Sequence, residues 1–398
     1  MTGCQRAQAR AGCWEYKHME PTGKRLRAVV VGAGWAGEGH TLALRDTGVE
    51  VVAICARNAE VVGKVAERLG VPEGSTDWRE AIARLRPEIV AIGTPGSVRR
   101  EVVEAAVAVG AHILCDKPLA LTGEDAADVY RMVRTAGVRH AYASTHQYDP
   151  SVAWVRELLG QGIIGVLQQV QVSLAHRLRP IGPWVWLWDL ASGGGMLNNG
   201  ATHFFGILER LVGGEITGAT GWADRTERML PVVPGMHDFR DFSNMEFTPE
   251  QAAQYPQRMA DADLQHIMLL RMSTATGDVH VTLQFMPVAS AEPNRWRLLG
   301  TTGELIGYGM LGFNRIMHVP HGGGEATEHP VPDRFVAALP AIESHVQAKW
   351  TALVRDFVAD IRNEPHASYP TFRDGWRYQV AIDAIRNSRG IPPVPHDL

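Results

Sequence analysis

Short apolar runs alternate with longer amphipathic stretches between residue 26 and about residue 148. The predicted strands are 26–31, 49–55, 88–95, 111–118 and 138–144, and the predicted helices are 39–48, 58–69, 97–109 and 122–136. Buried β-branched runs that alternate with helices of this length are typical of a parallel sheet covered on both faces. We therefore predict an α/β domain over residues 24–148, with the doubly wound parallel sheet of a Rossmann fold.

The pattern changes after about residue 150. Residues 170–174 alternate apolar and polar positions, as a half-exposed strand does. The runs 264–272 and 278–285 predict an antiparallel hairpin, and 295–309 predicts another. A long irregular insertion is predicted over 223–262, and late helices over 344–362 and 373–387. The second domain, residues 149–398, is therefore expected to be α+β with a mostly antiparallel sheet.

Composition and charge limit the classes of function. The 398 residues are 45% apolar and carry a net charge of −4, so we expect no broad basic surface for nucleic acid. No apolar run approaches the roughly 18 residues of a membrane span, so we expect no membrane insertion. Cys55 and Cys115 end apparent buried strands, as reduced thiols do in cytoplasmic proteins. Residues 1–23 are expected to be a disordered tail, with Met19 as an alternative start.

A glycine motif lies between the first predicted strand and the first predicted helix. Gly32, Gly34 and Gly37 form G-x-G-x-x-G, with Trp35 and Ala36 between the second and third glycines. Such a turn lets a pyrophosphate approach the backbone at the positive end of the following helix. We predict that these five residues bind a dinucleotide; the alternative is a glycine turn without a ligand.

The end of the second strand bears on the choice of nucleotide. An acidic residue there normally holds the ribose 2′-hydroxyl, but this strand is followed by Ala56 and Arg57. Arg57 can pair with a 2′-phosphate, so we favour NADP(H) and keep NAD(H) as the alternative. A solvated surface arginine is the plainer interpretation of Arg57.

Lys117 is the first candidate for catalysis. It follows the predicted strand 111–115 and precedes Pro118, which biases it toward an extended conformation at the carboxyl end of the sheet. Ligands bind at that end of parallel sheets, and a desolvated lysine can take a proton from a substrate hydroxyl. The alternative is an ordinary solvated lysine before a turn.

A second candidate group lies on the helix that follows three consecutive glycines at 193–195. Asn199 and His203 are four residues apart and share a helical face with Met196 and Ile207. Polar side chains on an apolar stripe must be satisfied internally or face a binding site. The alternative is a hydrogen-bonded core histidine.

Together these motifs resemble the Gfo/Idh/MocA oxidoreductases, the relatives of glucose–fructose oxidoreductase and inositol dehydrogenase. The resemblance covers about residues 26–390, and the segments that carry it are 31–37, 93–95, 116–119, 193–203, 300–305 and 369–376. It implies that Lys117 and His203 stand at the positions of the catalytic lysine and histidine. It also implies cofactor contacts at Thr94, Pro95 and Asp116, and a C-terminal sheet that often forms dimers or tetramers.

The sequence departs from the family pattern at three positions. Asp116 replaces the usual Glu before Lys-Pro, and Asn199 stands where many members carry Asp. An amide can bind a hydroxyl but cannot accept its proton. Gln147, which we assign to the cofactor site, stands where relatives commonly have Arg. These changes put the substrate and the proton route in question.

Further aromatic and histidine residues are candidates for the substrate site. Trp184, Trp186 and Trp188 precede the glycine run, and Trp186 is chosen as a wall of a sugar site; packing anchors are the alternative. His176, at a strand end, is a further candidate for substrate binding; the alternative is a solvated histidine without a ligand. His318, His321 and His329 lie in a Gly/Pro loop without cysteine, so we expect no metal site.

The sequence thus predicts an NAD(P)-dependent oxidoreductase acting on a secondary alcohol or ketone of a sugar, sugar derivative or cyclitol. Lys117, assisted by His203, is expected to transfer the hydroxyl proton. One alternative is a redox-neutral enzyme that uses bound NAD for elimination or epimerisation of a glycoside. Another is a non-catalytic nucleotide or sugar sensor. A homodimer or homotetramer is expected.

Overall fold

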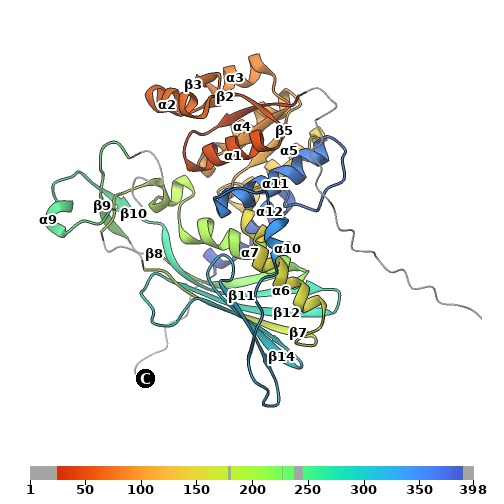
Figure 1. Cartoon of the computed structure of the whole chain (residues 1–398). Helices are drawn as coiled ribbons and strands as arrows, with labels where there is room; N and C mark the ends of the chain where they lie inside the picture. The colour runs from red at the N-terminus through yellow and green to blue at the C-terminus, as the bar shows by residue number, and fades with distance from the viewer. Residues whose placement is uncertain (1–24, 178–180, 226, 237–244, 389–398) are drawn as a thin grey trace, which may run out of the picture.

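The computed structural model describes residues 25–177, 181–225, 227–236 and 245–388. It has two large β-sheets, one near each end of the view in Figure 1, with several helices between them. The predicted tail 1–23 lies outside the described residues.

The N-terminal sheet, over the described residues, has six parallel strands in the order β3-β2-β1-β4-β5-β6. Its strands are β1 (Arg27–Val31), β2 (Glu50–Cys55), β3 (Glu73–Ser75), β4 (Ile89–Ile92), β5 (His112–Cys115) and β6 (His140–Tyr142). Its helices are α1 (Trp35–Asp46), α2 (Ala59–Leu69), α3 (Trp78–Leu85), α4 (Arg99–Ala108) and α5 (Gly123–Ala136). This confirms the predicted Rossmann sheet. The strand order reverses between β1 and β4, and the carboxyl ends of these strands border the place where such sheets bind ligands.

The sequence pattern missed two elements of this sheet, β3 and α3. β3 contains only Glu73, Gly74 and Ser75, so it has no apolar residue to signal a strand, and it is held by pairing with β2. The short helix α3 begins after Asp77, whose side chain accepts hydrogen bonds from the backbone of the next turn. Helix α1 also begins four residues earlier than predicted, at Trp35, directly after the glycine turn.

The C-terminal sheet has eight strands over the described part of the chain, in the order β16-β15-β14-β13-β7-β12-β11-β8. They are β7 (Leu167–Ala175), β8 (Glu215–Arg225), β11 (Asp263–Thr274), β12 (Gly277–Met286), β13 (Arg295–Gly300), β14 (Gly303–Tyr308), β15 (Arg315–Pro320) and β16 (Thr327–Glu328). Only β7 and β12 pair in parallel, so the prediction of a mostly antiparallel sheet with both hairpins is confirmed. Buried and exposed residues alternate along β11, and on its open face Leu269 is 52% exposed.

The prediction of an irregular insertion over 223–262 was partly wrong. β8 continues to Arg225, and β9 (Arg228–Pro231) pairs with β10 (Gln257–Ala260) in a separate antiparallel sheet. Helix α9 (Pro249–Ala252) begins on a proline, which needs no N–H partner at that position. Residues 226 and 237–244 of this segment lie outside the described part of the chain.

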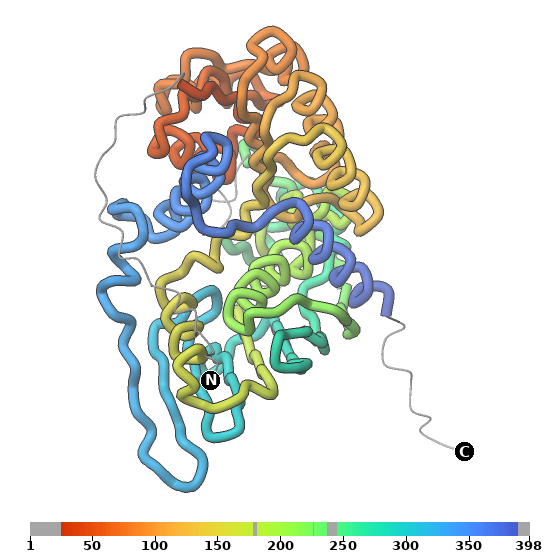
Figure 2. Tube along the Cα trace, turned by 90° about the vertical axis from the view of Figure 1, so that its right-hand side faces the viewer, coloured from red at the N-terminus to blue at the C-terminus, as the bar shows by residue number. Residues whose placement is uncertain are grey.

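The remaining helices connect the two sheets. Helix α6 (Pro150–Gly160), which was not predicted, packs on α7 (Thr202–Val212), and the short helix α10 (Asp333–Ala337) packs on α6. The predicted late helices are present as α11 (His345–Ile361) and α12 (Phe372–Arg386). α11 packs against α1, and α12 lies between α5 and β8 (Figure 2). The last part of the chain therefore returns to the N-terminal sheet.

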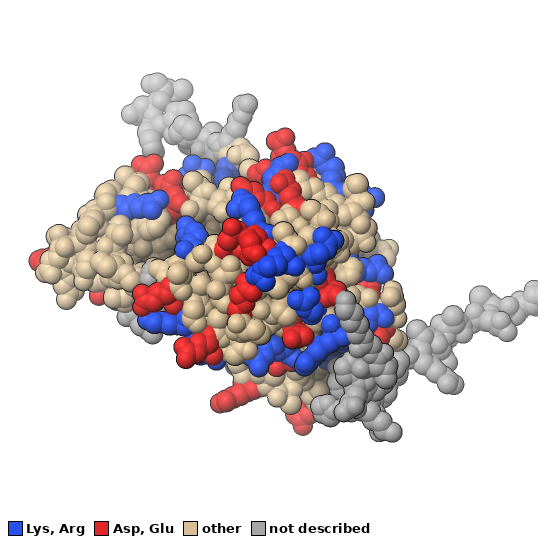
Figure 3. Space-filling view, turned by 90° about the horizontal axis from the view of Figure 1, so that it is seen from above, with Lys and Arg blue, Asp and Glu red and all other residues tan. Residues whose placement is uncertain are grey.

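The surface shows no segregation of charge on the face seen in Figure 3, where acidic and basic side chains are interspersed. Within the described ranges, no helix is both long and apolar enough to cross a membrane.

Candidate active site

The glycine turn between β1 and α1 brings backbone segments into very close contact. Gly32 has a φ of +119°, and a Cβ atom there would lie 2.7 Å from the carbonyl carbon of Gly93. A Cβ atom at Gly37 would lie 1.7 Å from the carbonyl oxygen of Gly32. Only glycine fits at either position, so α1 begins directly against the end of β1.

The N-terminus of α1 is open to a ligand. Gly34 is the N-cap, and no side chain among the described residues caps this helix, whereas Asn58 caps α2. Trp35 is exposed and Ala36 is partly exposed in the first turn. Backbone N–H groups and the positive end of the helix dipole suit a pyrophosphate. The turn therefore fits a dinucleotide.

The end of β2 is more acidic than the sequence pattern indicated. Arg57 is exposed. The backbone N–H of Ala56 donates to the backbone carbonyl of Ser75 on the neighbouring strand at 3.0 Å. Burial and then the charges of Glu73 and Asp77 raise the pKa of the Cys55 thiol to about 12. Carboxylates therefore do lie near this strand end, supplied by β3 and the turn after it.

The buried side chain of Arg99 holds together the loops that follow β4 and β5. Its Nε atom donates to the carbonyl of Thr94 at 2.9 Å, and its guanidinium also donates to the carbonyls of Asp116, Lys117 and Pro118. A buried guanidinium needs this many acceptors, and satisfying them fixes both loops. The Oγ1 atom of Thr94 is buried and has no hydrogen-bond partner among the described residues, so it is free to bond a cofactor.

Lys117 and Asn199 form the central contact of the site. The Nζ atom of Lys117 donates to Oδ1 of Asn199 and lies 3.4 Å from the Asn199 carbonyl oxygen. Burial lowers the pKa of Lys117 to about 8; the negative charge of Asp116 opposes this shift and the positive charge of Arg99 adds to it. A lysine with that pKa can both take and return a proton near neutral pH.

Asp116 orients the backbone of this lysine. Its Oδ1 atom accepts the N–H of Lys117 at 2.7 Å, and its Oδ2 atom lies 3.1 Å from Nε2 of His40 on α1. Burial alone raises the pKa of Asp116, but the hydrogen bond from His40 and the charge of Lys117 outweigh it and hold the pKa below its usual value. The His40 ring stacks on Trp350 of α11, with ring centroids 5.0 Å apart.

His203 lies at the start of α7, beyond a π-helical turn formed by Leu197–Ala201. Its ring packs edge-on against His146, with centroids 4.5 Å apart and planes at 87°. Burial, followed by the effects of His146 and Lys117, lowers the pKa of His203 well below its usual value. The His203 ring is therefore neutral near pH 7. It can donate one hydrogen bond and accept another, but it is not in the charged imidazolium form.

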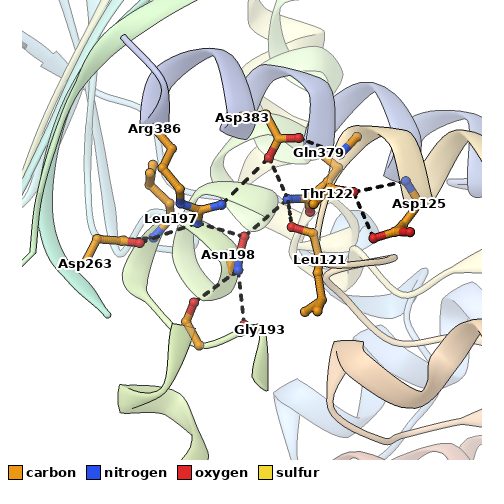
Figure 4. A network of polar contacts seen from close by, with 12 residues as sticks. Leu121, Thr122, Asp125, Gly193, Leu197, Asn198, Asp263, Gln379, Asp383 and Arg386 are labelled. Carbon is orange, nitrogen blue, oxygen red and sulfur yellow. Dashed lines mark hydrogen bonds and ion pairs between the residues drawn. The ribbon is translucent and has the colours of Figure 1, made fainter. Parts of the chain in front are cut away.

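Asn198 belongs to a buried polar network that reaches α12 (Figure 4). Its side-chain amide donates to the carbonyl of Gly193 at 3.2 Å, and its Oδ1 atom accepts from Arg386 at 3.2 Å. Gln379 donates to the same Oδ1 atom at 3.5 Å and to the carbonyl of Leu121 at 3.1 Å. The network thus joins the turn before Asn199 to the loop after Lys117.

Two carboxylates complete the network. Asp263 on β11 accepts the backbone N–H of Leu197 at 2.7 Å and lies 3.5 Å from Arg386. Asp383 on α12 accepts the backbone N–H of Gly123 at 2.6 Å. The C-terminal helix therefore contacts both segments that carry the candidate residues, although it lies far from them in sequence (Figure 4).

Two family profiles match the chain. The profile described as an oxidoreductase family with an NAD-binding Rossmann fold matches residues 26–144, and that of the GFO/IDH/MocA C-terminal domain matches residues 152–306. The chain belongs to the Gfo/Idh/MocA oxidoreductase family. The resemblance inferred from the motifs is confirmed.

Individual family members resemble only part of the sequence but nearly all of the fold. Levoglucosan dehydrogenase of Pseudarthrobacter phenanthrenivorans is 29% identical over 202 residues, which cover 48% of this chain and 52% of that enzyme. D-glucoside 3-dehydrogenase of Escherichia coli is 26% identical over 167 residues, 42% of this chain and 47% of that enzyme. The chain spans about half the length of these curated relatives. A solved structure of levoglucosan dehydrogenase in complex with NADH and L-sorbose has a TM-score of 0.75 at 21% identity, covering 91% of this chain and 96% of that one, which shows a shared fold.

The tryptophans before the glycine run of this Gfo/Idh/MocA protein differ in their surroundings. Trp184 and Trp188 donate their indole N–H groups to backbone carbonyls, at 3.0 and 3.2 Å, and act as packing anchors. Trp186 is 38% exposed and is open to a ligand. His176 is exposed after β7, next to residues 178–180, which lie outside the described part.

The structure places the partly exposed Gln147 in contact with neighbouring protein groups. Its amide donates to the carbonyl of Ser144 at 3.0 Å, and its Nε2 atom would lie 3.2 Å from a Cβ atom at Gly206 on α7. It stays a predicted cofactor residue that the structure places against a helix. His318 and His329 face each other with ring centroids 6.0 Å apart, and no metal-binding group of three or more ligands occurs among the described residues.

Sequence reasoning missed His40, Arg99, His146 and Lys349, all of which contact the site. Each is a single polar residue in a helix or turn, and its neighbours in sequence give no indication of its partner. A buried polar side chain is evident from sequence only when the group that satisfies it is also known. Here the partners lie on other elements, so no local signal identified them.

Proposed function

We propose that the protein is an NAD(P)-dependent oxidoreductase that interconverts a secondary alcohol and a ketone on a sugar, sugar derivative or cyclitol. The observation that carries this proposal is the environment of Lys117. It lies at the carboxyl end of β5, hydrogen-bonded to Asn199, with its pKa lowered to about 8. The preceding residue, Asp116, contacts His40 on the helix that follows the glycine turn. The sugar dehydrogenases among the partial relatives support the substrate class.

The residues of the chain move the proton. In alcohol oxidation the neutral amine of Lys117 takes the proton of the substrate hydroxyl, and in ketone reduction its ammonium returns it. The nicotinamide of a bound dinucleotide supplies the acceptor or donor for the hydride. Asn199 holds the Nζ atom without adding a charge that would raise the pKa. His203, being neutral, hydrogen-bonds the substrate oxygen and orients it.

The dinucleotide and the sugar have separate supports. We assign the pyrophosphate to the turn at Gly32–Gly37 and the N-terminus of α1, and further cofactor contacts to Thr94 and Pro95. Trp186 has an exposed indole that suits the apolar C–H face of a sugar ring. His176 is the second residue we assign to the sugar, on its exposure alone.

Replacing Lys117 by Met tests the proposal. We expect turnover of sugars, followed by absorbance of the reduced nucleotide, to fall by about 10²–10⁴-fold, with nucleotide affinity unchanged. The control is Lys64→Met, which removes an exposed lysine of α2. A Lys117→Met enzyme as fast as wild type would refute the role of this lysine. Turnover without net absorbance change would favour the redox-neutral alternative.

We further propose that NADP(H) is the preferred cofactor, bound through Arg57. The side chain is exposed at the end of β2, and the carboxylates near this strand end are engaged: Glu73 and Glu80 pair with Arg84, and Asp77 caps α3. Arg57→Ala should then weaken NADPH binding by about 10–100-fold and leave NADH binding unchanged. The control is Arg131→Ala, the same charge change on α5. Equal losses for both nucleotides would contradict the assignment.

The expected homodimer or homotetramer is proposed to form through the open face of the C-terminal sheet. Ile267 and Leu269 are exposed side by side on β11 of that face. A second copy of the chain would cover them, as expected of adjacent exposed apolar residues. Light scattering should give a multiple of the 43.6 kDa chain mass for wild type, and a monomer for Leu269→Lys. Val288→Lys, in the loop after β12, is the control.

A further inference from the structure

A buried lysine from the end of the chain reaches the active site. Lys349 lies on α11, beyond the regions matched by either family profile, which end at residue 306. Lys349 is only 6% exposed. Its Nζ atom lies 3.1 Å from Oδ2 of Asp149 and 3.2 Å from Nδ1 of His146. Burying an ammonium group costs free energy even when it is paired, so its place beside a histidine of the site calls for a functional explanation.

The contact determines where His146 carries its proton. An ammonium group can only donate hydrogen bonds, so Nδ1 of His146 is the acceptor and the ring proton is on Nε2. The contact with Lys349 holds the Nδ1 side of the ring, and the ring packs at 87° to that of His203, with centroids 4.5 Å apart. Lys349 thereby sets the surface against which His203 rests.

Positively charged side chains outnumber negatively charged ones around His146 and His203. Lys349 approaches from α11 and Lys117 from the loop after β5. Among the described residues, the carboxylate that opposes them at His146 is the partly buried Asp149 at the start of α6. Burial, then the charges of Lys349 and Lys117, lower the pKa of His146 to about 3. A protonated His203 would add a like charge beside Lys117 and would compete with it for the substrate proton.

We propose that Lys349 is a positioning residue that fixes the His146 ring in one tautomer and, as a neighbouring cation, opposes protonation of that ring. The consequence is that His203, packed against a fixed and neutral ring, is placed to bind the substrate oxygen beside Lys117. This consequence rests on the proposed function, whereas the effect of Lys349 on the histidines does not. No step of the reaction passes through Lys349 itself.

The test is a pH titration of the histidines by NMR in the full-length, nucleotide-free protein labelled with ¹⁵N-histidine. The His146 and His203 signals are assigned from His→Gln variants. In wild type we expect neither ring to take up a proton between pH 5 and 8. In Lys349→Met we expect the protonation midpoint of His146 to rise by about 1–2 pH units, so that uptake becomes visible near pH 5.

Two further variants separate charge from packing. Lys349→Arg keeps the cation and should titrate as wild type does, also serving if the Met variant does not fold. Gln347→Ala removes a hydrogen bond of the same helix to Gly39 without touching the histidines, and should leave both midpoints unchanged. An unchanged or lower His146 midpoint in Lys349→Met, or a shift as large in Gln347→Ala, overturns the proposal. If the midpoints move as expected but no sugar is oxidised or reduced, the proposed function fails and the positioning role stands.

Discussion

Changing Asn199 to Asp tests the electrostatic environment of Lys117 directly. Oδ1 of Asn199 accepts a hydrogen bond from the lysine ammonium, so the substitution puts a carboxylate in direct contact with it. An opposite charge at this separation favours the ammonium form and raises a lysine pKa, by about 1–3 units in general. We therefore expect the pKa of Lys117 to rise from about 8 to about 9.5 in Asn199→Asp.

The size of the effect follows from the fraction of neutral lysine. With a pKa of about 8, roughly 9% of Lys117 is neutral at pH 7. With a pKa of about 9.5 the neutral fraction falls to roughly 0.3%, a loss of about 30-fold. Alcohol oxidation needs the neutral amine, so its kcat/KM at pH 7 should fall by that factor and recover at high pH. Ketone reduction needs the ammonium, so it should rise about twofold at pH 8.

The assay is the initial rate in both directions from pH 6 to 10, followed by absorbance of the reduced nucleotide. Asn199→Ala is the matched variant, because it removes the acceptor without adding a charge. It should move the midpoint to lower pH, which gives the order Asp, Asn, Ala from highest to lowest. An Asp variant whose midpoint stays the same or falls would refute the assignment of the titrating group to Lys117.

Two buried residues outside the proton route give further predictions. His266 on β11 is fully buried against Phe285, has no hydrogen-bond partner for either ring nitrogen among the described residues, and has its pKa lowered to about 3 by burial. In the unfolded chain this histidine protonates near pH 6.5, so lowering the pH from 7.5 to 5 should reduce the free energy of unfolding by about 2 kcal/mol through this residue. The loss should be absent in His266→Phe. Urea unfolding of both proteins at the two pH values checks this, and equal losses would contradict it. Arg99→Lys keeps the charge but cannot reach all four carbonyls, so the free energy of unfolding should fall by about 2–4 kcal/mol and nucleotide binding should weaken. Thermal and urea unfolding check this; unchanged stability would show that the hydrogen bonds of Arg99 are dispensable.

The accuracy of the sequence predictions followed the strength of the local pattern. The helices α11 and α12 and the strands β11 and β12 were predicted within a few residues, because their periodicity extends over ten or more positions. β3 was missed because a three-residue edge strand needs no apolar residue. The π-helical turn at Leu197–Ala201 was predicted as ordinary helix, since backbone bulges leave no mark in hydrophobic periodicity.

The sequence also determined the chemistry of the site more than its geometry. Lys117 and Asn199 were both candidates, and the structure places them in direct contact. The expected assistance of Lys117 by His203 stays a prediction, and the structure adds that burial and neighbouring groups lower the pKa of the His203 ring. That environment depends on which buried groups lie near it, and sequence spacing does not report this.

What the sequence determined by itself was the Rossmann sheet, the glycine turn and the lysine at the end of β5, because each depends on residues adjacent in the chain. The tertiary structure alone decided which groups distant in sequence hydrogen-bond around the site and set its electrostatics. Lys349 lies 203 positions after His146, and Asp383 lies 260 positions after Gly123. Electrostatic energies and hydrogen bonds depend on distance in space and on burial, and these are defined only once the chain has folded.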